Sequence, residues 1–251
     1  KVGNKLIIEH NIDRLKSFGI ENLNITIKYL GEQLVNEFGD GSGKGISINY
    51  IHETSPLGTI GSLRLVNRIK NDALLVMNSD LLTNIDLEDF YNEFRKKDAD
   101  ISIATIPYTI NIPYAIMEIE EDQVLSLKEK PTFVYQSNAG IYLLKKECIK
   151  LIPEDTFYNA TDFIENAISK GLKVSHYQIL GYWLDIGNHA DYQKAQEDIK
   201  HIKIYDDKYK KYTIIYCDND NQIQYKFIEN LFNNETCVGL LNLSSIDKLV
   251  R

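Results

Sequence analysis

Apolar positions in the first part of the chain alternate between helical and extended spacing. Ile8, Ile12 and Leu15 recur at i, i+4 and i+7, and Phe18 continues this stripe up to Gly19. The pattern predicts an amphipathic helix that ends at Gly19. The same reasoning predicts strands over 23–29, 46–51 and 73–78 and helices over 32–38, 60–69 and 86–97, the last capped by Asp86. Strands alternating with helices favour parallel βαβ units with right-handed crossovers.

Beyond residue 100 extended patterns predominate. They predict strands over 101–106, 114–119, 124–127, 137–144 and 173–179, an extended segment over 182–186, and helices over 145–151, 160–170 and 188–200. The expected fold class is therefore α/β, with a Rossmann-like mixed, mostly parallel sheet flanked by helices.

The tail differs from the preceding part in composition. Residues 203–211 are charged and rich in tyrosine, and the rest offers strand candidates at 212–216 and 237–243 and a helix candidate at 223–232. A segment of this length buries little core alone, so we expect it to dock on the main domain or on a partner. We expect a core domain over 1–200 and a C-terminal extension over 201–251.

Composition and charge narrow the class of protein. The 251 residues are 43% hydrophobic and 25% charged, as in globular proteins, and the formal charge is −8 with a pI near 5.2. This acidity argues against a nucleic-acid partner. Three widely spaced cysteines fit a reducing compartment and show neither disulfide nor zinc spacing. With no stretch as long as a membrane span, we expect a cytoplasmic protein without a membrane partner.

Two aspartates follow apolar segments in the manner of strand-end ligands. Asp80 follows the run 73–77 and Asp185 follows 181–184. Ligands of open α/β sheets bind at the carboxyl ends of the strands, and Mg²⁺ takes one or two carboxylates together with phosphates and water. The pair predicts a Mg²⁺ site. The alternative is that each aspartate belongs to a turn or caps a helix.

Two glycine-containing loops have different contexts. The segment 53–61, Glu-Thr-Ser-Pro-Leu-Gly-Thr-Ile-Gly, follows a strand and opens a predicted helix, where backbone N–H groups can face a ligand. Its alternative is an ordinary loop with Thr59 as helix N-cap. The segment 39–45 joins a helix to a strand, so a structural turn is the better interpretation.

Two polar segments lie further along. In 128–131, Lys-Glu-Lys-Pro, a lysine can meet a phosphate and Glu129 can accept from sugar hydroxyls, although such segments are more often solvated loops. Asn138 opens the segment 138–140, where an amide can bind a hydroxylated ligand or form a turn.

The order of these motifs is more specific than each motif. It resembles the sugar-phosphate nucleotidyltransferases over about residues 1–200. The motifs are Lys1-Val-Gly-Asn-Lys5 with Glu9, Pro56-Leu-Gly-Thr-Ile-Gly61, Asn78-Ser-Asp80, Glu129-Lys-Pro131, Asn138-Ala-Gly-Ile-Tyr142 and Trp183-Leu-Asp-Ile-Gly187. The form Leu57-Gly58-Thr59 is most similar to the guanylyltransferase branch, typified by GDP-mannose pyrophosphorylase.

The resemblance implies a fold of the nucleotide-diphospho-sugar transferase type and a reaction. A sugar 1-phosphate attacks an NTP, with GTP favoured, to give an NDP-sugar and pyrophosphate with Mg²⁺ as cofactor. NTP and sugar 1-phosphate are thus the implied partners. The implied site consists of Asp80 and Asp185 as metal ligands, Lys130 on the sugar phosphate, Glu53, Leu57, Gly58 and Thr59 at the nucleotide, and Glu129, Asn138 and Gly140 at the sugar. Such a transfer needs positioning and electrostatic stabilisation more than a general base, which fits the absence of a histidine cluster.

One departure from the family pattern affects the expected activity. The family opens with a glycine-rich phosphate-binding segment, whereas this chain begins part-way into the pattern, with Leu6 where a proline is usual. We therefore expect a truncated chain or a lost phosphate loop, and weak or no turnover.

The sequence leaves alternatives open. One is a metal-dependent glycosyltransferase, which usually has Asp-x-Asp where residue 78 here is Asn. Another is a non-catalytic regulatory subunit that binds a nucleotide-sugar. The base, the sugar and the formation of a homo-oligomer are not fixed by the sequence.

Overall fold

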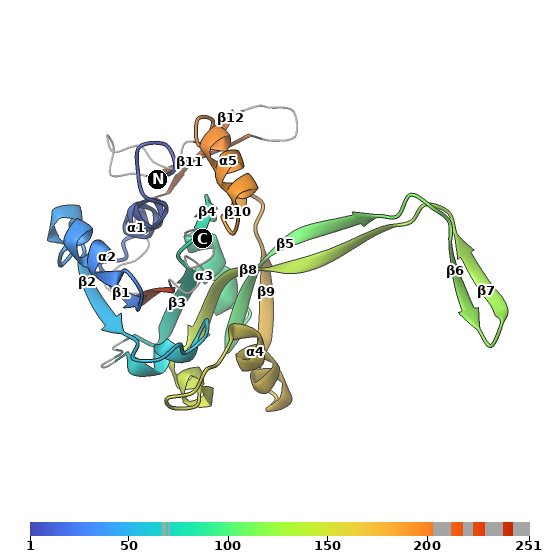
Figure 1. Ribbon diagram of the computed structural model, residues 1–251, viewed down its shortest axis with the longest axis horizontal. Helices are drawn as coiled ribbons and strands as arrows, with labels where there is room; N and C mark the ends of the chain where they lie inside the picture. The colour runs from blue at the N-terminus through green and yellow to red at the C-terminus, as the bar shows by residue number, and fades with distance from the viewer. Residues whose placement is uncertain (67–68, 70, 203–211, 218–222, 229–237, 243–251) are drawn as a thin grey trace.

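A mixed sheet forms the centre of the molecule in the computed structural model (Figure 1). The structure describes residues 1–66, 69, 71–202, 212–217, 223–228 and 238–242, the last three stretches by their backbone. The strand order is β2-β1-β13-β3-β8-β5-β9, and only β8 runs antiparallel to the others in this sheet. The bounds are β1 Asn22–Ile27, β2 Ser47–His52, β3 Ala73–Asn78, β5 Ile101–Asn111, β8 Thr132–Lys145, β9 Val174–Gln178 and β13 Val238–Asn242. The predicted α/β fold with a mixed, mostly parallel sheet is confirmed.

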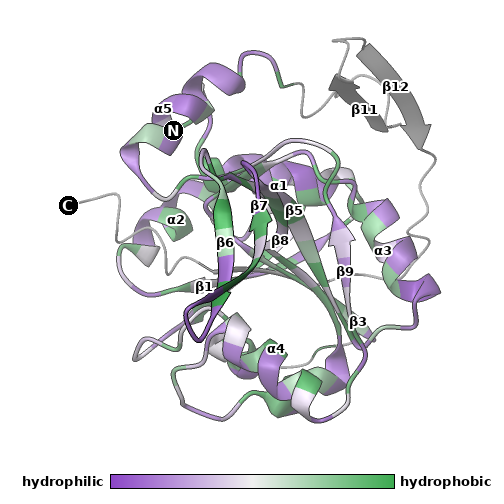
Figure 2. Ribbon diagram, turned by 90° about the vertical axis from the view of Figure 1, so that its right-hand side faces the viewer, coloured by the Kyte–Doolittle hydropathy of each residue, from purple (hydrophilic) through white to green (hydrophobic). Residues whose placement is uncertain are grey.

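Helices cover both faces of this sheet (Figure 2). The α-helices are α1 Ile7–Ser17, α2 Gly31–Phe38, α3 Leu87–Lys96, α4 Ala160–Ser169 and α5 His189–Asp198, and the 3₁₀ helices are η1 Ser42–Lys44, η2 Gly61–Leu65 and η3 Lys146–Leu151. The expected cap is present, because the Asp86 side chain accepts a hydrogen bond from the Asp89 amide. None of the helices in the described residues is long and apolar enough to cross a membrane.

Strand β3 shows why both faces need covering. Its residues alternate between two apolar clusters, because successive side chains of a strand point to opposite faces. Leu75 and Met77 pack with residues of α1, α2 and α3 on one face. Leu74 and Val76 pack with residues of η2, η3 and α4 on the other. A strand buried on both faces reads as a continuous apolar run, which is the pattern seen over 73–77.

The tail contributes a strand to the middle of the sheet. β13 lies between β1 and β3 and is parallel to both, with Leu23 opposite Gly239 and Leu240 opposite Val76. Strands β11 Tyr212–Cys217 and β12 Ile223–Ile228 form a separate antiparallel pair. The division into a core and an extension stays a prediction.

Three expected helices differ in the structure. In the described residues of 60–69, which are 60–66 and 69, the structure has only the short 3₁₀ helix η2, because the amides of Ile60 and Gly61 both donate to the Tyr158 carbonyl and tie the segment to its neighbour. The region 145–151 is likewise 3₁₀. The helix expected over 223–232 is wrong where the structure describes it, since 223–228 is a strand. The sequence there alternates apolar and polar residues with period two.

Strands β5 and β8 are longer than expected and form an arm. They pair antiparallel out to Asn111 opposite Thr132, whereas β9 flanks β5 only as far as Thr105 and β3 flanks β8 only as far as Ile141. The hairpin of β6 Ile116–Glu120 and β7 Gln123–Lys128 follows at the far end. We call residues 106–137 the arm, its paired segments 106–111 and 132–137 the stalk, and β6–β7 the tip hairpin. The arm projects from the body (Figure 1).

An ion-pair cluster attaches the glycine-rich turn 39–45 to α1. The Lys44 ammonium lies 2.6 Å from a Glu9 carboxylate oxygen and 3.0 Å from Asp13, and Lys5 lies 2.6 Å from Asp13. Burial acts to raise the pKa of Asp13, but hydrogen bonds from Lys5 and Lys44 outweigh it and hold this pKa below its ordinary value. The turn is therefore held by its lysine, as a structural element.

We expect Asp13→Asn to lower the free energy of unfolding by about 1 kcal/mol at neutral pH, because it removes the two partly buried ion pairs with Lys5 and Lys44. Since the folded pKa of Asp13 is lowered, its stabilisation is complete above the ordinary aspartate pKa of about 3.9 and disappears as the pH falls through the lower folded value. The difference between wild type and variant in urea unfolding should narrow over that range. Asp122→Asn, in an exposed turn, is the control. A difference that stays constant with pH would contradict this account.

Candidate functional site

The carboxyl end of β3 presents a polar segment at the edge of the sheet. Strand β3 ends at Asn78, Ser79 and Asp80 follow, and β4 Leu81–Thr83 begins immediately. Asp80 is only 3% exposed. The Asn11 side chain, on α1, donates to the Ser79 carbonyl at 2.9 Å and holds this segment in place.

A short ladder brings Asp185 to the same position. β10 Trp183–Asp185 pairs antiparallel with β4, and Asp185 lies opposite Leu81. The Ile186 amide donates to the Asp80 carbonyl at 3.1 Å. The two aspartates that the sequence singled out, far apart in the chain, are therefore neighbours across two strands. Asp185 is exposed and Asp80 is buried, so the pair lies at the boundary between core and solvent.

A buried arginine anchors α1 to the chain just past β4. The guanidinium of Arg14 donates to the Ile85 carbonyl and lies 5.0 Å from the centroid of the Phe18 ring. Burial lowers the pKa of Arg14 to about 10, and the nearby Asp86 opposes this shift. The side chain remains protonated at neutral pH and fixes the helix behind the Asn78–Asp80 segment.

Asn138 and Gly140 lie beside the end of β3. Gly140 has φ +70°, and a Cβ there would lie 2.7 Å from the side-chain nitrogen Nδ2 of Asn78. The Asn138 oxygen accepts from the Gly140 amide at 2.9 Å, and its nitrogen donates to the Tyr142 hydroxyl at 2.9 Å. A primary amide has a second N–H and a second lone pair, so Asn138 can still bind a ligand hydroxyl.

Trp183 connects the segment 138–140 with the strand β10 that ends at Asp185. Its indole N–H donates to the Ala139 carbonyl at 2.9 Å, while two residues later β10 ends at Asp185. Trp183 belongs to the motif 183–187, but its sequence context predicted no role for it at the site. The only signal it offered was that the single tryptophan of the chain stands two positions before a strand-end aspartate.

The loop 53–61 leaves the same edge of the sheet, because β2 and β3 run in the same direction. The Leu57 amide donates to a Glu53 carboxylate oxygen at 3.2 Å, and the Leu57 carbonyl accepts from the Tyr158 amide at 2.9 Å. The Thr59 hydroxyl accepts from the Ala160 amide at 2.8 Å. Thr59 therefore serves the first turn of α4, which corrects the alternative that it caps a helix of its own.

Glu129 and Lys130 lie apart from the other predicted site residues. They follow β7 at the far end of the stalk, where the Pro131 carbonyl accepts from the Ile112 amide at 3.1 Å. At about 3.3 Å per residue, the extended chain between Lys130 and Asn138 spans on the order of 25 Å. The structure does not bring them to Asp80 and Asp185, and their roles at the sugar and its phosphate stay predictions.

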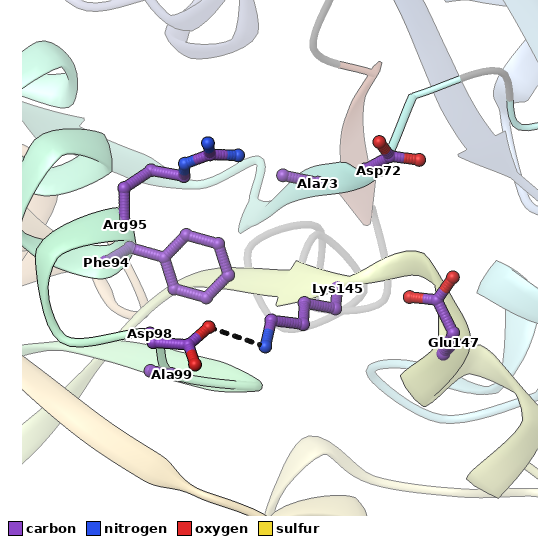
Figure 3. A pocket seen from close by; sticks show the side chains of 8 residues that line it. All are labelled: Asp72, Ala73, Phe94, Arg95, Asp98, Ala99, Lys145 and Glu147. Carbon is purple, nitrogen blue, oxygen red and sulfur yellow. Dashed lines mark hydrogen bonds and ion pairs between the residues drawn. The ribbon is translucent and has the colours of Figure 1, made fainter.

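A cavity of about 530 Å³ lies at the opposite edge of the sheet (Figure 3). Its lining residues are Asp72, Ala73, Phe94, Arg95, Asp98, Ala99, Lys145 and Glu147. Lys145 forms ion pairs with Asp98 at 3.0 Å and with Asp100 at 3.1 Å. Because β3 starts at this edge and ends at Asn78, the cavity is separate from the candidate site.

We expect Gly58→Ala to lower the free energy of unfolding by about 2–3 kcal/mol. Gly58 has φ +76°, which alanine adopts only with strain, and a Cβ would lie 2.5 Å from the Tyr158 carbonyl oxygen. Gly43→Ala is the matched control, since a Cβ there meets nothing within 4 Å, and it should change stability by less than about 1 kcal/mol. Equal changes in chemical denaturation would show that the loop is not held against Tyr158.

The sequence matches a known family over most of its length. The family model described as "Nucleotidyl transferase" matches residues 1–202. The chain is 29% identical over 202 residues to a mannose-1-phosphate guanylyltransferase of Mycobacterium tuberculosis, covering 76% of this chain and 55% of the relative. It is 32% identical over 220 residues to a probable mannose-1-phosphate guanylyltransferase 1 of Oryza sativa, covering 83% and 58%. The chain thus spans little more than half the length of these curated relatives.

Solved structures show the same fold. A putative glucose-1-phosphate thymidylyltransferase from Bacillus anthracis matches with a TM-score of 0.64 at 22% identity, over 82% of this chain and 87% of that one. HddC from Yersinia pseudotuberculosis matches with a TM-score of 0.62 at 23% identity, over 79% and 88%. The arrangement of sheet and helices is shared with both.

Proposed function

The chain belongs to the nucleotidyl transferase family, and on that premise we propose that it transfers a nucleotidyl group from an NTP to a sugar 1-phosphate. The observation that carries the proposal is the convergence of Asp80 and Asp185 at the carboxyl edge of the sheet. In open α/β sheets this edge binds ligands. Relatives named as guanylyltransferases and thymidylyltransferases support this reaction class.

The residues at this edge fit a magnesium ion. Two carboxylates, one buried and one exposed, are a donor set that Mg²⁺ accepts, since it fills its remaining positions with water and phosphate oxygens. Asp80 and Asp185 would hold the ion. When bound, it would neutralise charge on the triphosphate.

The reaction balances without a protein base. An oxygen of the sugar phosphate forms a bond to the α-phosphorus of the NTP, and the bond from that phosphorus to the bridging oxygen of the β-phosphate breaks. The bond electrons leave with pyrophosphate. The attacking oxygen is already anionic at neutral pH, so the protein has to position the two anions and offset their repulsion.

The protein groups around the aspartates have separate tasks. Asn138, fixed by the Gly140 amide and the Tyr142 hydroxyl, would orient a sugar hydroxyl with its remaining donor and acceptor. The loop 53–61, held by Tyr158, would form the wall for the base. We favour GTP because of Leu57-Gly58-Thr59 and because relatives at 29–32% identity are named guanylyltransferases.

We expect guanine nucleotides with Mg²⁺ to stabilise the chain selectively. At a ligand concentration 100 times the dissociation constant, the free energy of unfolding should rise by roughly 2.7 kcal/mol. Thermal unfolding with GTP, GDP-sugars and their uridine, cytidine, adenine and thymidine counterparts, with and without Mg²⁺, tests this. A shift with a different base would overturn the preference for GTP, and no shift with any nucleotide would overturn the proposed function.

We expect Asp80→Asn and Asp185→Asn each to abolish the Mg²⁺-dependent part of that stabilisation. The weak pyrophosphate release expected of the wild-type chain should fall to background in both variants on the same substrates, because transition-state charge is no longer offset. Asp98→Asn, at the cavity on the opposite edge, is the matched control and should change neither measurement. Full Mg²⁺-dependent stabilisation in both variants would show that these aspartates do not bind the ion.

A further inference from the structure

Trp183 lies between the residues that the proposed function assigns to the metal and those that it assigns to the sugar. Its indole N–H donates to the Ala139 carbonyl at 2.9 Å, across 44 positions of the sequence. Asn138 and Gly140 flank Ala139, and strand β10, which Trp183 begins, ends at Asp185. One hydrogen bond therefore joins the strand of a metal aspartate to the segment that carries the sugar-binding amide.

The Ala139 carbonyl lies where strand β8 is irregular. Between its pairs with Ile103 and Thr105, β8 has three residues where β5 has one. The registers with β5 and with β3 give Ala139 and Gly140 no opposite residue in either strand. Ala139 is 0% exposed, and a buried carbonyl outside a ladder needs a hydrogen-bond partner. The indole supplies one and so holds the irregular part of β8 in the conformation that presents Asn138.

The other end of this link is held as well. Trp183 lies opposite Thr83 in the ladder between β10 and β4, and its partly buried side chain packs against the apolar cluster that contains Ala139. The Thr83 hydroxyl donates to the Tyr182 carbonyl at 2.8 Å, which fixes the residue before β10. A displacement of β10 would therefore reach the segment 138–140 through a hydrogen bond and packed side chains.

The link is buried, but the groups at its two ends face solvent. Asp185 and Asn138 are both exposed, whereas Ala139 is buried. Irregularities of this kind in a strand occur beside active sites, where they re-aim a side chain. An apolar ring would fill the same space as the indole, but only a donor can join the two segments.

We propose that Trp183 is a positioning residue that couples the metal site to the sugar site. Mg²⁺ bound by Asp80 and Asp185 fixes β10, and the indole N–H transmits that order to Asn138, so the ion raises the affinity for the sugar. Because coupling between two sites is reciprocal, the sugar raises the affinity for the ion by the same factor. The inference rests on the proposed function and requires no contact of the tryptophan with either ligand.

Isothermal titration of the full chain with GDP-mannose and with GDP, each with and without Mg²⁺, measures this coupling. GDP-mannose is the probe because two relatives are named mannose-1-phosphate guanylyltransferases. Both probes contain guanosine diphosphate, so the ratio of their affinities isolates the contribution of the sugar. We expect Mg²⁺ to raise this ratio by roughly fivefold or more in the wild type. In Trp183→Phe, which keeps an apolar ring and loses the donor, Mg²⁺ should change the ratio by less than about twofold.

Tyr182→Phe is the matched control. It removes the hydroxyl that the neighbouring residue donates to Asp198 at 2.6 Å, toward α5, so the Mg²⁺ dependence of the ratio should stay as in the wild type. Asn138→Ala removes the sugar-binding amide and should abolish this dependence while the tryptophan is unchanged. Thermal unfolding without ligand shows which variants are folded. If Trp183→Phe is not, the wild type and Asn138→Ala still decide the question.

The outcomes separate this inference from the proposed function. A wild type that binds neither probe would overturn the proposed use of a guanine nucleotide, and this inference with it. A wild type that binds both probes at a ratio independent of Mg²⁺ would overturn the coupling alone, as would an Asn138→Ala variant or a folded Trp183→Phe variant that keeps the Mg²⁺ dependence. An equal loss in Tyr182→Phe would show that the bond to Ala139 has no special part, which would also overturn it.

Discussion

The three-residue ladder between β4 and β10 is the interaction on which the candidate site depends. Asp80 and Asp185 are far apart in the sequence, and each follows an apolar segment. Backbone groups alone fix the relative position of the two aspartates. Asp185 pairs with Leu81 in the ladder, and the Ile186 amide donates to the Asp80 carbonyl. Side-chain substitutions around the aspartates can therefore alter chemistry while this geometry persists.

The body of the sheet supports that ladder from both sides. Alternate residues of β3 fill two separate apolar clusters, so the strand that delivers Asp80 is held on both faces. Helix α1 adds two polar contacts, from Asn11 to Ser79 and from Arg14 to Ile85, on either side of β4. The loop 53–61 is fixed differently, by hydrogen bonds with the segment before α4. The buried strand β3 thus supports exposed residues at the edge of the sheet, such as Asp185, that can contact ligands.

Hydrophobic periodicity predicted the fold well where burial decides structure. The helices at α1, α3 and α4 and the buried strand β3 follow from their apolar spacing, and Asp86 marked a helix start. Periodicity failed where contacts with a distant segment determine the local structure. At the start of η2, the amides of Ile60 and Gly61 donate to the Tyr158 carbonyl, and the expected longer helix does not form there. The convergence of Asp80 and Asp185 was predicted from strand ends, but the placement of Lys130 depends on how far β5 and β8 continue beyond the sheet. Pairing between exposed strands leaves little trace in local sequence.

The position of β13 has a consequence for how the chain folds. Its backbone fills the place between β1 and β3, yet residues 238–242 come after every other strand of that sheet in sequence. During synthesis, β1 and β3 leave the ribosome long before their common neighbour, and the central ladder stays open until then. Contacts between such distant segments slow folding and expose unpaired strand edges in the meantime. We therefore expect slow folding of this chain, because the middle of its mixed sheet is completed by the strand that comes last in sequence among the described strands of that sheet.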